Sequence, residues 1–292
     1  ALLGGNLRLA LTGAAPVAAE MLEFFDACGI LVLEAWGLTE SSGVGTANTP
    51  DRFKFGTQGH TLPQCEVRLA ERSDSQDGDS DDGDSQDGDA QEDGEGSDPG
   101  AEVLLRGPML FRGYYKMDEE TAEAIDEEGW FHTGDVGSID DDGFLTITGR
   151  TKDIIVTSSG KNVPAARIEN EITNSRWIAH AVVYGDDKNY LVALVTLDED
   201  ERPKLAEQAG VTDDLEQMVE SEAVRSEIEQ AIDAANENFA RIEQVKRFTI
   251  LPRDLSADEG ELTATMKVKR KVVYDNHRDR FEALYEEDGA SS

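Results

Sequence analysis

The chain contains 292 residues, of which 38% are apolar, and is long enough to form two ordinary domains with buried cores. It carries 62 acidic and 27 basic residues, which gives a formal net charge of -35. A field of this sign repels nucleic acid and anionic lipid, so DNA and RNA are excluded as general partners.

The first 72 residues alternate strand and helix patterns. Short apolar runs at 7–11 and 30–33 predict buried strands, and apolar residues at helical spacing predict a helix over 17–28 that Gly29 ends. The strand–helix–strand order predicts an α/β layer. Because the chain begins with Ala1 and leads directly into a strand pattern, we expect a piece of a longer gene product.

Residues 73–98 differ from the rest of the chain. They contain twelve acidic residues and no basic ones, and no apolar side chain larger than Ala. Such a segment cannot form a core and is predicted to be a disordered surface loop. A calcium loop is the alternative, because Asp77, Asp79 and Asp81 have the first spacings of an EF-hand. However, Asp82 stands where that loop requires Gly, and Gly88 where it requires Glu.

The acidic excess persists outside this segment, and Lys is scarcer than Arg. This pattern is typical of a protein that is hydrated in high salt, where screening reduces self-repulsion. The alternative is a moderately acidic protein with one acidic insert. We favour a halophilic protein.

Regular structure is expected again from residue 101. Strands are predicted at 102–106 and 144–148, with a short helix over 118–126 between them. A second unit begins near 149–152, with a helix over 164–173 and strands at 179–184, 191–197 and 248–251. Helices are predicted at 201–209 and, as one long element, at 212–239. This order predicts a small α+β domain.

The segment Trp36-Gly37-Leu38-Thr39-Glu40 combines residue types that suit a nucleotide. An aromatic ring can lie against a base, a Thr hydroxyl can bond a phosphate oxygen, and a carboxylate can hold Mg²⁺. The alternative is a turn in which Thr39 or Ser41 caps a helix.

Two later segments contain further candidates. Asp135 ends Gly129-Trp130-Phe131-His132-Thr133-Gly134-Asp135, and its carboxylate can accept both hydroxyls of a ribose; the alternative is a hairpin turn with an exposed Asp. Arg150 can reach ribose or phosphate. The turn at Gly160-Lys161 exposes backbone N–H groups.

The fourth segment is basic, although the chain is acidic. It reads Glu261-Leu262-Thr263-Ala264-Thr265-Met266-Lys267-Val268-Lys269-Arg270-Lys271. One interpretation is charge balance on a surface element. The other is a mobile lysine that is delivered to a developing negative charge.

Together, in this order and spacing, the four segments resemble the adenylate-forming superfamily, most closely the long-chain fatty acyl-CoA synthetases. The resemblance covers the chain except its acidic insert. It implies the C-terminal part of the large AMP-binding domain over residues 1–150, followed by a mobile C-terminal lid domain over 151–292. Three departures are Trp36 in place of Tyr, Ala264 in place of Pro, and the absence of the Ser/Thr/Gly-rich phosphate loop expected upstream.

The resemblance also implies a role for individual residues. Lys267 would stabilise charge at the α-phosphate, Thr39 would contact phosphate, and Glu40 would hold Mg²⁺. Lys152 would be the hinge, and the Gly160–Lys161 loop would serve the CoA step. The remaining implied nucleotide contacts are Gly13, Ala14, Ala15 and Pro16 at the adenine, Trp36 and Gly37 beside the base, and Asp135 and Arg150 at the ribose.

The implied activity is ATP-dependent ligation of a long-chain fatty acid to CoA through an acyl-adenylate, releasing AMP and pyrophosphate. The expected partners are the fatty acid, ATP, CoA and the N-terminal portion of the same enzyme, without which we expect little activity. The alternatives are a non-catalytic AMP-binding or interaction module and an adenylating ligase for another carboxylate.

Location and cysteine chemistry follow from simpler observations. No signal peptide and no apolar run long enough for a membrane span is present, so we expect a cytoplasmic protein and leave peripheral membrane contact open. Cys28 and Cys65 have neither disulfide nor metal spacing and are expected to be small buried residues.

Overall fold

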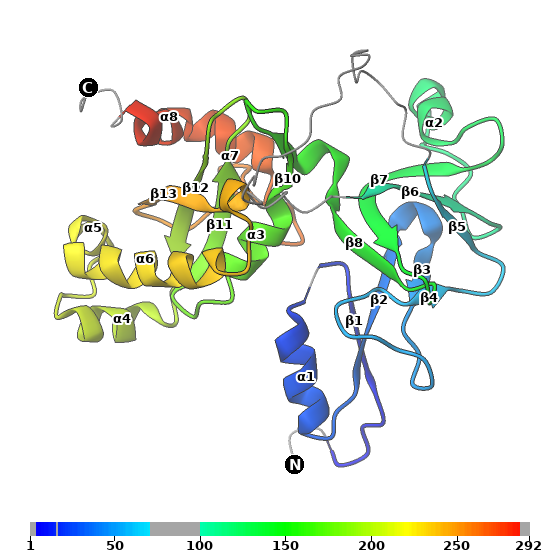
Figure 1. Cartoon of the computed structure of the whole chain (residues 1–292), viewed down its shortest axis with the longest axis horizontal. Coiled ribbons are helices and arrows are strands. Elements are labelled where there is room, and N and C mark those ends of the chain that lie inside the picture. The colour runs from blue at the N-terminus through cyan, green and yellow to red at the C-terminus, as the bar shows by residue number, and fades with distance from the viewer. Residues whose placement is uncertain (1–3, 16, 71–99, 287–292) are drawn as a thin grey trace, which may run out of the picture.

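The computed structural model describes residues 4–15, 17–70 and 100–286. An N-terminal part of β-sheets is followed by a C-terminal part in which helices cover both faces of a sheet (Figure 1). This mixed arrangement confirms the predicted α/β class. The acidic segment 73–98, with the calcium alternative at Asp77, Asp79 and Asp81, lies outside the described residues.

The first sheet has the order β1-β2-β3-β4 and carries one helix, α1 (Ala19–Ala27). Its strands are β1 (Ala10–Gly13), β2 (Val32–Leu38), β3 (Gly43–Ala47) and β4 (His60–Thr61). β1 runs parallel to β2, and their pairing begins at Ala10 opposite Val32. The first strand therefore starts three residues later than predicted, because only from Ala10 onward does it have a partner strand.

The second sheet is antiparallel, with the order β5-β6-β7-β8. Its strands are β5 (Glu66–Leu69), β6 (Ala101–Arg106), β7 (Phe131–Ile139) and β8 (Leu145–Arg150), and α2 (Asp118–Ala124) lies in the β6–β7 connection. One apolar cluster joins this sheet to the first, since Trp36 packs with Val103, Leu105 and Phe131. This contact fixes β2 against β7.

The C-terminal part begins with a hairpin of β9 (Ile154–Val156) and β10 (Asn162–Pro164), followed by α3 (Ala165–Ile172). Its main sheet has the order β11-β12-β13, formed by β11 (Ile178–Tyr184), β12 (Leu191–Leu197) and β13 (Val245–Ile250). Every residue of β12 is buried. Alternate side chains of a strand point to opposite faces, so Ala193 and Val195 join one core, and Val192 and Leu194 join the other.

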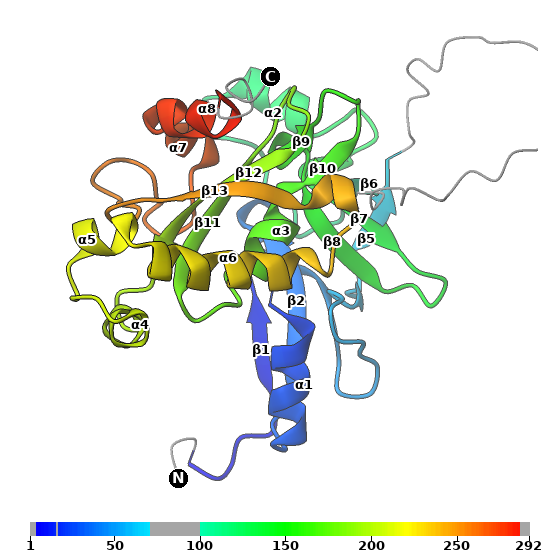
Figure 2. The same cartoon turned by 60° about the vertical axis from the view of Figure 1, so that its left-hand side comes forward.

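Helices cover both faces of this sheet (Figure 2). The first core contains side chains of α3, α4 (Arg202–Ala209), α5 (Leu215–Glu220) and α6 (Glu222–Asn236). The second contains side chains of α7 (Arg270–Asn276) and α8 (Arg278–Glu286). The small α+β unit expected from the sequence is thus present in this part of the chain.

The prediction of one helix over 212–239 is wrong. The segment forms two helices that separate at Ser221, whose backbone is extended (φ -79°, ψ 121°). The Ser221 hydroxyl accepts a hydrogen bond from the Val224 amide, and Asp214 caps α5 in the same way at Gln217. Serine at an N-cap satisfies a free helical N–H, so it starts a new helix rather than continuing the old one.

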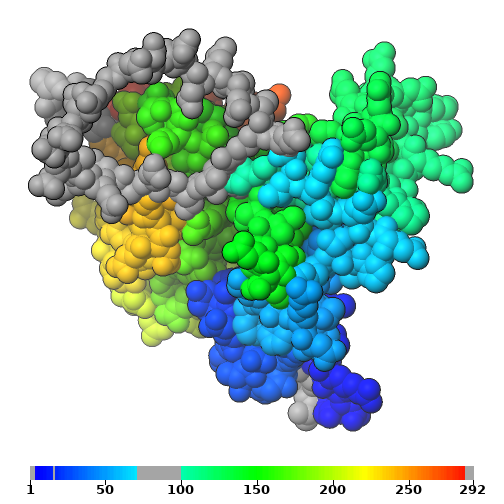
Figure 3. All heavy atoms as spheres, turned by 45° about the vertical axis from the view of Figure 1, so that its right-hand side comes forward, coloured from blue at the N-terminus to red at the C-terminus, as the bar shows by residue number. Residues whose placement is uncertain are grey.

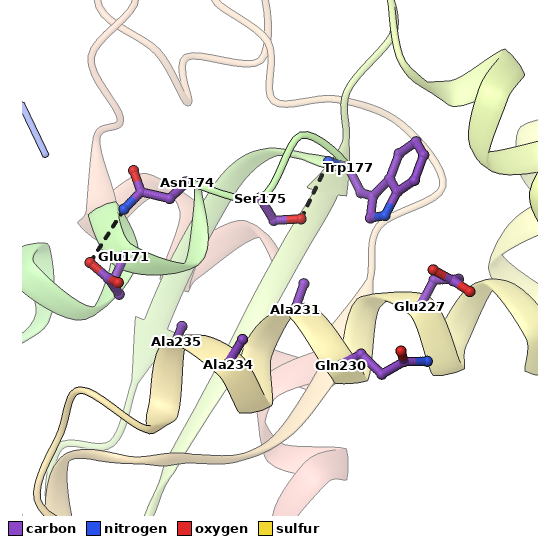
Figure 4. Close-up of a pocket in the computed structure, with 9 residues that line it drawn as sticks. All are labelled: Glu171, Asn174, Ser175, Trp177, Glu227, Gln230, Ala231, Ala234 and Ala235. Atoms are coloured by element: carbon purple, nitrogen blue, oxygen red, sulfur yellow. Dashed lines mark hydrogen bonds between the residues drawn. The ribbon is translucent and has the colours of Figure 1, made fainter. Parts of the chain in front are cut away.

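A hollow between α3 and α6 is lined by Glu171, Asn174, Trp177 and three alanines of α6, with three further residues (Figure 4). Two hydrogen bonds between residues close in sequence lie at its rim. Asn174 donates to Glu171, and the Trp177 amide donates to the Ser175 hydroxyl. None of the candidate site residues lines it.

The expectation that both cysteines are buried is wrong. Cys28 is exposed at the end of α1, and Cys65 is only partly buried. Cys28 is exposed because the outer face of α1 is uncovered in the described structure. Among the residues that the structure describes, no helix has both the length and the apolar character required to span a bilayer.

Candidate active site

Asp135 lies at the centre of the candidate site. It stands inside β7 and is only 5% exposed, so the hairpin turn with an exposed Asp is wrong. The register of the second sheet places it opposite Arg150 at the end of β8. Arg150 Nε lies 2.8 Å from Asp135 Oδ1, while 57% of the arginine side chain remains exposed.

Trp36 holds the other oxygen of this carboxylate. Its indole Nε1 donates a hydrogen bond to Asp135 Oδ2 at 2.8 Å, across 99 residues of sequence. The ring is 8% exposed and packs in the cluster that joins the two N-terminal sheets. Thus Trp36 orients Asp135 by a hydrogen bond that sequence reasoning did not foresee.

Burial raises the pKa of the Asp135 carboxyl, because the charged form loses hydration. The positive charge of Arg150, the Trp36 hydrogen bond and the charge of Lys267 oppose this shift and lower the pKa. Arg150, Trp36 and Lys267 therefore favour the carboxylate form in this buried position.

The turn after β1 lies at the same place. Gly13 ends β1 so close to β2 that a Cβ would stand 2.7 Å from the Ala35 carbonyl oxygen. Ala14 adopts a positive φ of 69°. Its carbonyl oxygen accepts a hydrogen bond from Lys267 Nζ at 2.7 Å. Ala15 is exposed beside it, and Pro16 lies outside the described residues.

Lys267 comes from a narrow loop of the C-terminal part. An isolated bridge pairs Leu262 with Val268, and the Thr263 amide donates to the Lys267 carbonyl oxygen at 2.8 Å. The Lys267 amide in turn donates to the Thr263 hydroxyl at 3.0 Å. The loop backbone is therefore held by its own hydrogen bonds, while the lysine side chain projects to the turn after β1, 253 residues away.

Thr39 and Glu40 occupy a single 3-10 turn, Thr39–Ser41, directly after β2. Gly37 permits this turn, because a Cβ there would stand 1.7 Å from the Gly43 carbonyl oxygen. Sequence reasoning missed Tyr114, whose hydroxyl donates to Glu40 Oε1 at 3.0 Å. No pattern in the sequence indicates this contact, since 74 residues separate the two.

Two predicted residues lie elsewhere. Lys152 is exposed in the 3-10 turn Thr151–Asp153, which joins β8 to β9. Gly160 and Lys161 lie at the β9–β10 turn. In the same turn, the Ser158 amide donates to the Lys188 carbonyl oxygen and the Ser158 hydroxyl donates to the Asn189 side chain, both in the β11–β12 connection. The structure thus brings together residues 13–14, Trp36, Asp135, Arg150 and Lys267, and leaves the 160–161 turn with the C-terminal part.

This grouping has the chemistry of an anion site with one acidic contact. A buried carboxylate can accept hydroxyl groups, and Arg150 and Lys267 supply positive charge next to it. In the described ranges no cluster of three His, Cys, Asp or Glu side chains could hold a metal ion by itself. A divalent ion at Glu40 would therefore need further ligands, such as water or the oxygens of a bound phosphate.

Comparison with known proteins gives the same grouping a family context. Residues 1–115 match the family model described as AMP-binding enzyme, and residues 152–289 match the AMP-binding enzyme C-terminal domain. The long-chain-fatty-acid–CoA ligase FadD15 of Mycobacterium bovis is 37% identical over 289 residues, which are 98% of this chain and 43% of that protein. The ligase ACSBG1 of Rattus norvegicus is 36% identical, with 94% of this chain and 38% of that protein aligned. The chain thus spans less than half the length of these relatives.

Solved structures agree on the fold. The A domain of the carboxylic acid reductase from Segniliparus rugosus, in complex with AMP and a co-purified carboxylic acid, superposes with a TM-score of 0.73 at 24% identity. The alignment covers 98% of this chain and 40% of that one. The o-succinylbenzoate CoA synthetase of Bacillus subtilis, in complex with its acyl-adenylate, gives a TM-score of 0.64 at 22% identity, over 90% of this chain and 45% of that one.

Proposed function

The chain belongs to the AMP-binding enzymes, and we propose that it forms the C-terminal portion of an AMP-forming ligase that joins a long-chain fatty acid to CoA. The observation that carries the proposal is the 2.7 Å contact from Lys267 Nζ to the Ala14 carbonyl oxygen. It places the positive charge of the C-terminal part beside Asp135 and Arg150 of the N-terminal part.

The proposed reaction has two steps. A carboxylate oxygen of the fatty acid attacks the α-phosphorus of ATP, the bond to the β-phosphate oxygen breaks, and pyrophosphate leaves. The CoA sulfur then attacks the carbonyl carbon of the acyl-AMP, loses its proton to solvent, and releases AMP. Both steps build negative charge on a phosphate, which a placed cation stabilises.

The residues take the following proposed roles. Trp36 and Arg150 hold the Asp135 carboxylate in place. This carboxylate accepts hydrogen bonds from the ribose hydroxyls. Lys267 neutralises charge at the α-phosphate in the first step. The turn at Gly13–Ala15 flanks the adenine, and Trp36 and Gly37 lie at the same edge of the site. Thr39 contacts phosphate.

Glu40 suits one Mg²⁺ ion shared with the ATP phosphates. Its carboxylate stands on a turn where Tyr114 fixes one oxygen, and Mg²⁺ in nucleotide sites is held by one or two carboxylates plus substrate phosphates. The ion would offset phosphate charge. What the chain itself contributes is the orientation of the Glu40 carboxylate.

We further propose that residues 151–292 move as a lid relative to residues 1–150. Lys152, exposed in the turn between β8 and β9, would be the hinge. Loop residues absorb such rotations. The Gly160–Lys161 turn, which is separate from the Lys267 contact, would then serve the CoA step.

The proposed partner is the N-terminal portion of the same enzyme. β1 is the edge strand of its sheet, and large apolar side chains around it are exposed, including Leu11 (66%), Phe24 (63%) and Met21 (53%). Figure 3 shows this segment projecting from the rest of the molecule. An open edge strand beside exposed apolar side chains suits a further layer of sheet and helix.

The test is ATP–pyrophosphate exchange with a panel of fatty acids, for residues 1–292 alone and together with the proposed N-terminal portion. We expect exchange only with both portions, and acyl-CoA formation once CoA is added. Ordinary turnover by residues 1–292 alone would refute the dependence on a partner. If both portions bind AMP but never exchange, the chain is a non-catalytic AMP-binding module, and exchange with another carboxylate alone points to a different ligase.

The acidic surface predicts a salt-dependent stability, and we propose that the protein works in a cytoplasm of high ionic strength. Raising KCl from about 0.1 M to about 1 M shortens the screening length from about 10 Å to about 3 Å. The thermal midpoint of residues 1–292 should therefore rise by several degrees. A variant without residues 73–98 is the control and should show the same rise, because the acidic excess persists elsewhere. A midpoint that stays constant or falls contradicts the halophilic interpretation.

A further inference from the structure

Arg270 begins α7, three residues after Lys267, and is unusually enclosed for an arginine. Only 13% of its side chain is exposed. One terminal nitrogen lies 2.8 Å from Asp153 Oδ1, and the other donates to Glu169 Oε2. The guanidinium is therefore held by two carboxylates from different elements.

The two carboxylates belong to segments with distinct roles. Asp153 ends the turn that joins β8 to β9, directly after Lys152. Glu169 lies in the middle of α3, and its other oxygen accepts the Val183 amide of β11 at 2.8 Å. Arg270 thereby connects the segment between the two parts of the chain to the helix and sheet of the C-terminal part.

The Lys267 loop has a second anchor at its other end. Glu261 is fully buried, and its backbone carbonyl accepts the Lys269 amide at 2.7 Å. Its carboxylate accepts two hydrogen bonds from Arg253, both at 2.7 Å. The Glu261 anchor holds one end of the loop to the interior of the C-terminal part. Arg270 holds the other end to the 151–153 segment.

A continuous chain of contacts results. Asp135 pairs with Arg150, Asp153 follows Arg150 by three residues and pairs with Arg270, and Lys267 precedes Arg270 by three residues. The Lys267 side chain donates a hydrogen bond to the Ala14 carbonyl oxygen, which lies near Asp135. Displacement of Arg270 would shift the base of the lysine loop relative to the 151–153 segment.

We infer that Arg270 is a positioning residue, which holds the Lys267 loop and Asp153 together as one unit. Bending between the two parts of the chain is then confined to residues before Asp153. The Lys267 loop keeps a constant position relative to Asp153 when the lysine side chain reaches the site. The inference rests on the proposed function for its catalytic consequence. A planar guanidinium can hold two carboxylates at once, whereas a lysine ammonium acts as a point charge, so lysine should replace it only in part.

The first experiment measures amide hydrogen exchange on residues 1–292 and requires no ligase activity. Arg270→Met should speed exchange at the Lys267 and Lys269 amides and over residues 151–156, while strands β6 and β7 keep their protection. The matched control is Arg278→Met, which removes an equal charge from a side chain that is 71% exposed and pairs with Asp275. Unchanged exchange at both segments would overturn the inference, whether or not the protein is a ligase.

The second experiment measures pyrophosphate exchange by the two portions together. Asp153→Asn removes one of the two ion pairs of Arg270. Because Asp153 is partly exposed, this variant should fold even if Arg270→Met does not. We expect kcat to fall about tenfold or more, since misplacement of a catalytic group by about 1 Å can cost about a hundredfold, with KM for ATP little changed. Arg270→Lys should recover part of the rate that Arg270→Met loses.

The decisive comparison uses a background without the lysine. If Arg270 acts through Lys267, Asp153→Asn should cause almost no further loss in Lys267→Ala. An equal fold-loss in both backgrounds would overturn the inference. Absence of exchange in the unsubstituted protein would instead count against the proposed function, and the amide-exchange experiment would still decide the role of Arg270.

Discussion

Replacing Lys267 by alanine is expected to lower the rate of adenylation by about 10²–10³-fold, the loss typical of removing one preorganised group that stabilises transition-state charge. The lysine side chain reaches the turn after β1, where its Nζ lies 2.7 Å from the Ala14 carbonyl oxygen. It is also close enough to Asp135 for its charge to oppose the rise that burial causes in the pKa of that carboxyl. Under the proposed function, this charge acts on the α-phosphate.

The two half-reactions separate this role from a general loss of structure. Pyrophosphate exchange reports the first, and release of acyl-CoA from supplied acyl-AMP reports the second, which should stay within about threefold because the lysine serves the first step. Lys271→Ala is the matched control, since it removes an exposed cation four residues further along. Equal losses in both half-reactions would contradict the assigned role.

Replacing Glu261 by glutamine is expected to destabilise the chain by about 1–3 kcal/mol, the usual cost of leaving hydrogen-bond donors without the acceptor that they contact. Glu261 is fully buried, yet it carries five hydrogen bonds from four residues. They come from Arg253, Ser256, Asn276 and His277. With glutamine, the Arg253 guanidinium loses the carboxylate that it contacts through two nitrogens. Urea unfolding followed by circular dichroism measures the change.

The same residue makes a specific pH prediction. Hydrogen bonds from Arg253, opposed by burial and assisted by Ser256, His277 and Asn276, lower the pKa of Glu261 to about 2 from an ordinary 4.5. A lowered folded-state pKa stabilises the protein above the unfolded-state pKa, and this stabilisation is lost as the pH falls toward 2. The stability difference between the native chain and Glu261→Gln should therefore shrink below about pH 4.5.

An exposed carboxylate provides the control for both measurements. Glu229→Gln, on the exposed side of α6, removes the same charge from the surface and should leave stability almost unchanged. A difference between Glu261→Gln and the native chain that stays constant from pH 6 to below pH 4 would show that the Glu261 contacts do not depend on its charge.

Sequence reasoning located the main elements of the C-terminal part because their patterns are local. The almost entirely apolar run of β12 and the periodic helix α3 can each be read from a window of a few residues. The break at Ser221 was missed, although a capping serine is a sequence signal, because the residues on both sides are good helix formers. The short strands β4, β5, β9 and β10 were missed because a few residues contain too little of a period. The strands β3 and β7 and the helices α7 and α8 were not predicted either.

The sequence by itself determined the family resemblance, the α/β class and the identity of the charged candidates Asp135, Arg150 and Lys267, because each stands in a recognisable local segment. The tertiary structure alone decided what these residues contact. Trp36 meets Asp135 across 99 residues, Tyr114 meets Glu40 across 74, and Lys267 meets Ala14 across 253. Such contacts depend on strand register and on how the two parts of the chain pack, and neither leaves a periodic trace in the sequence.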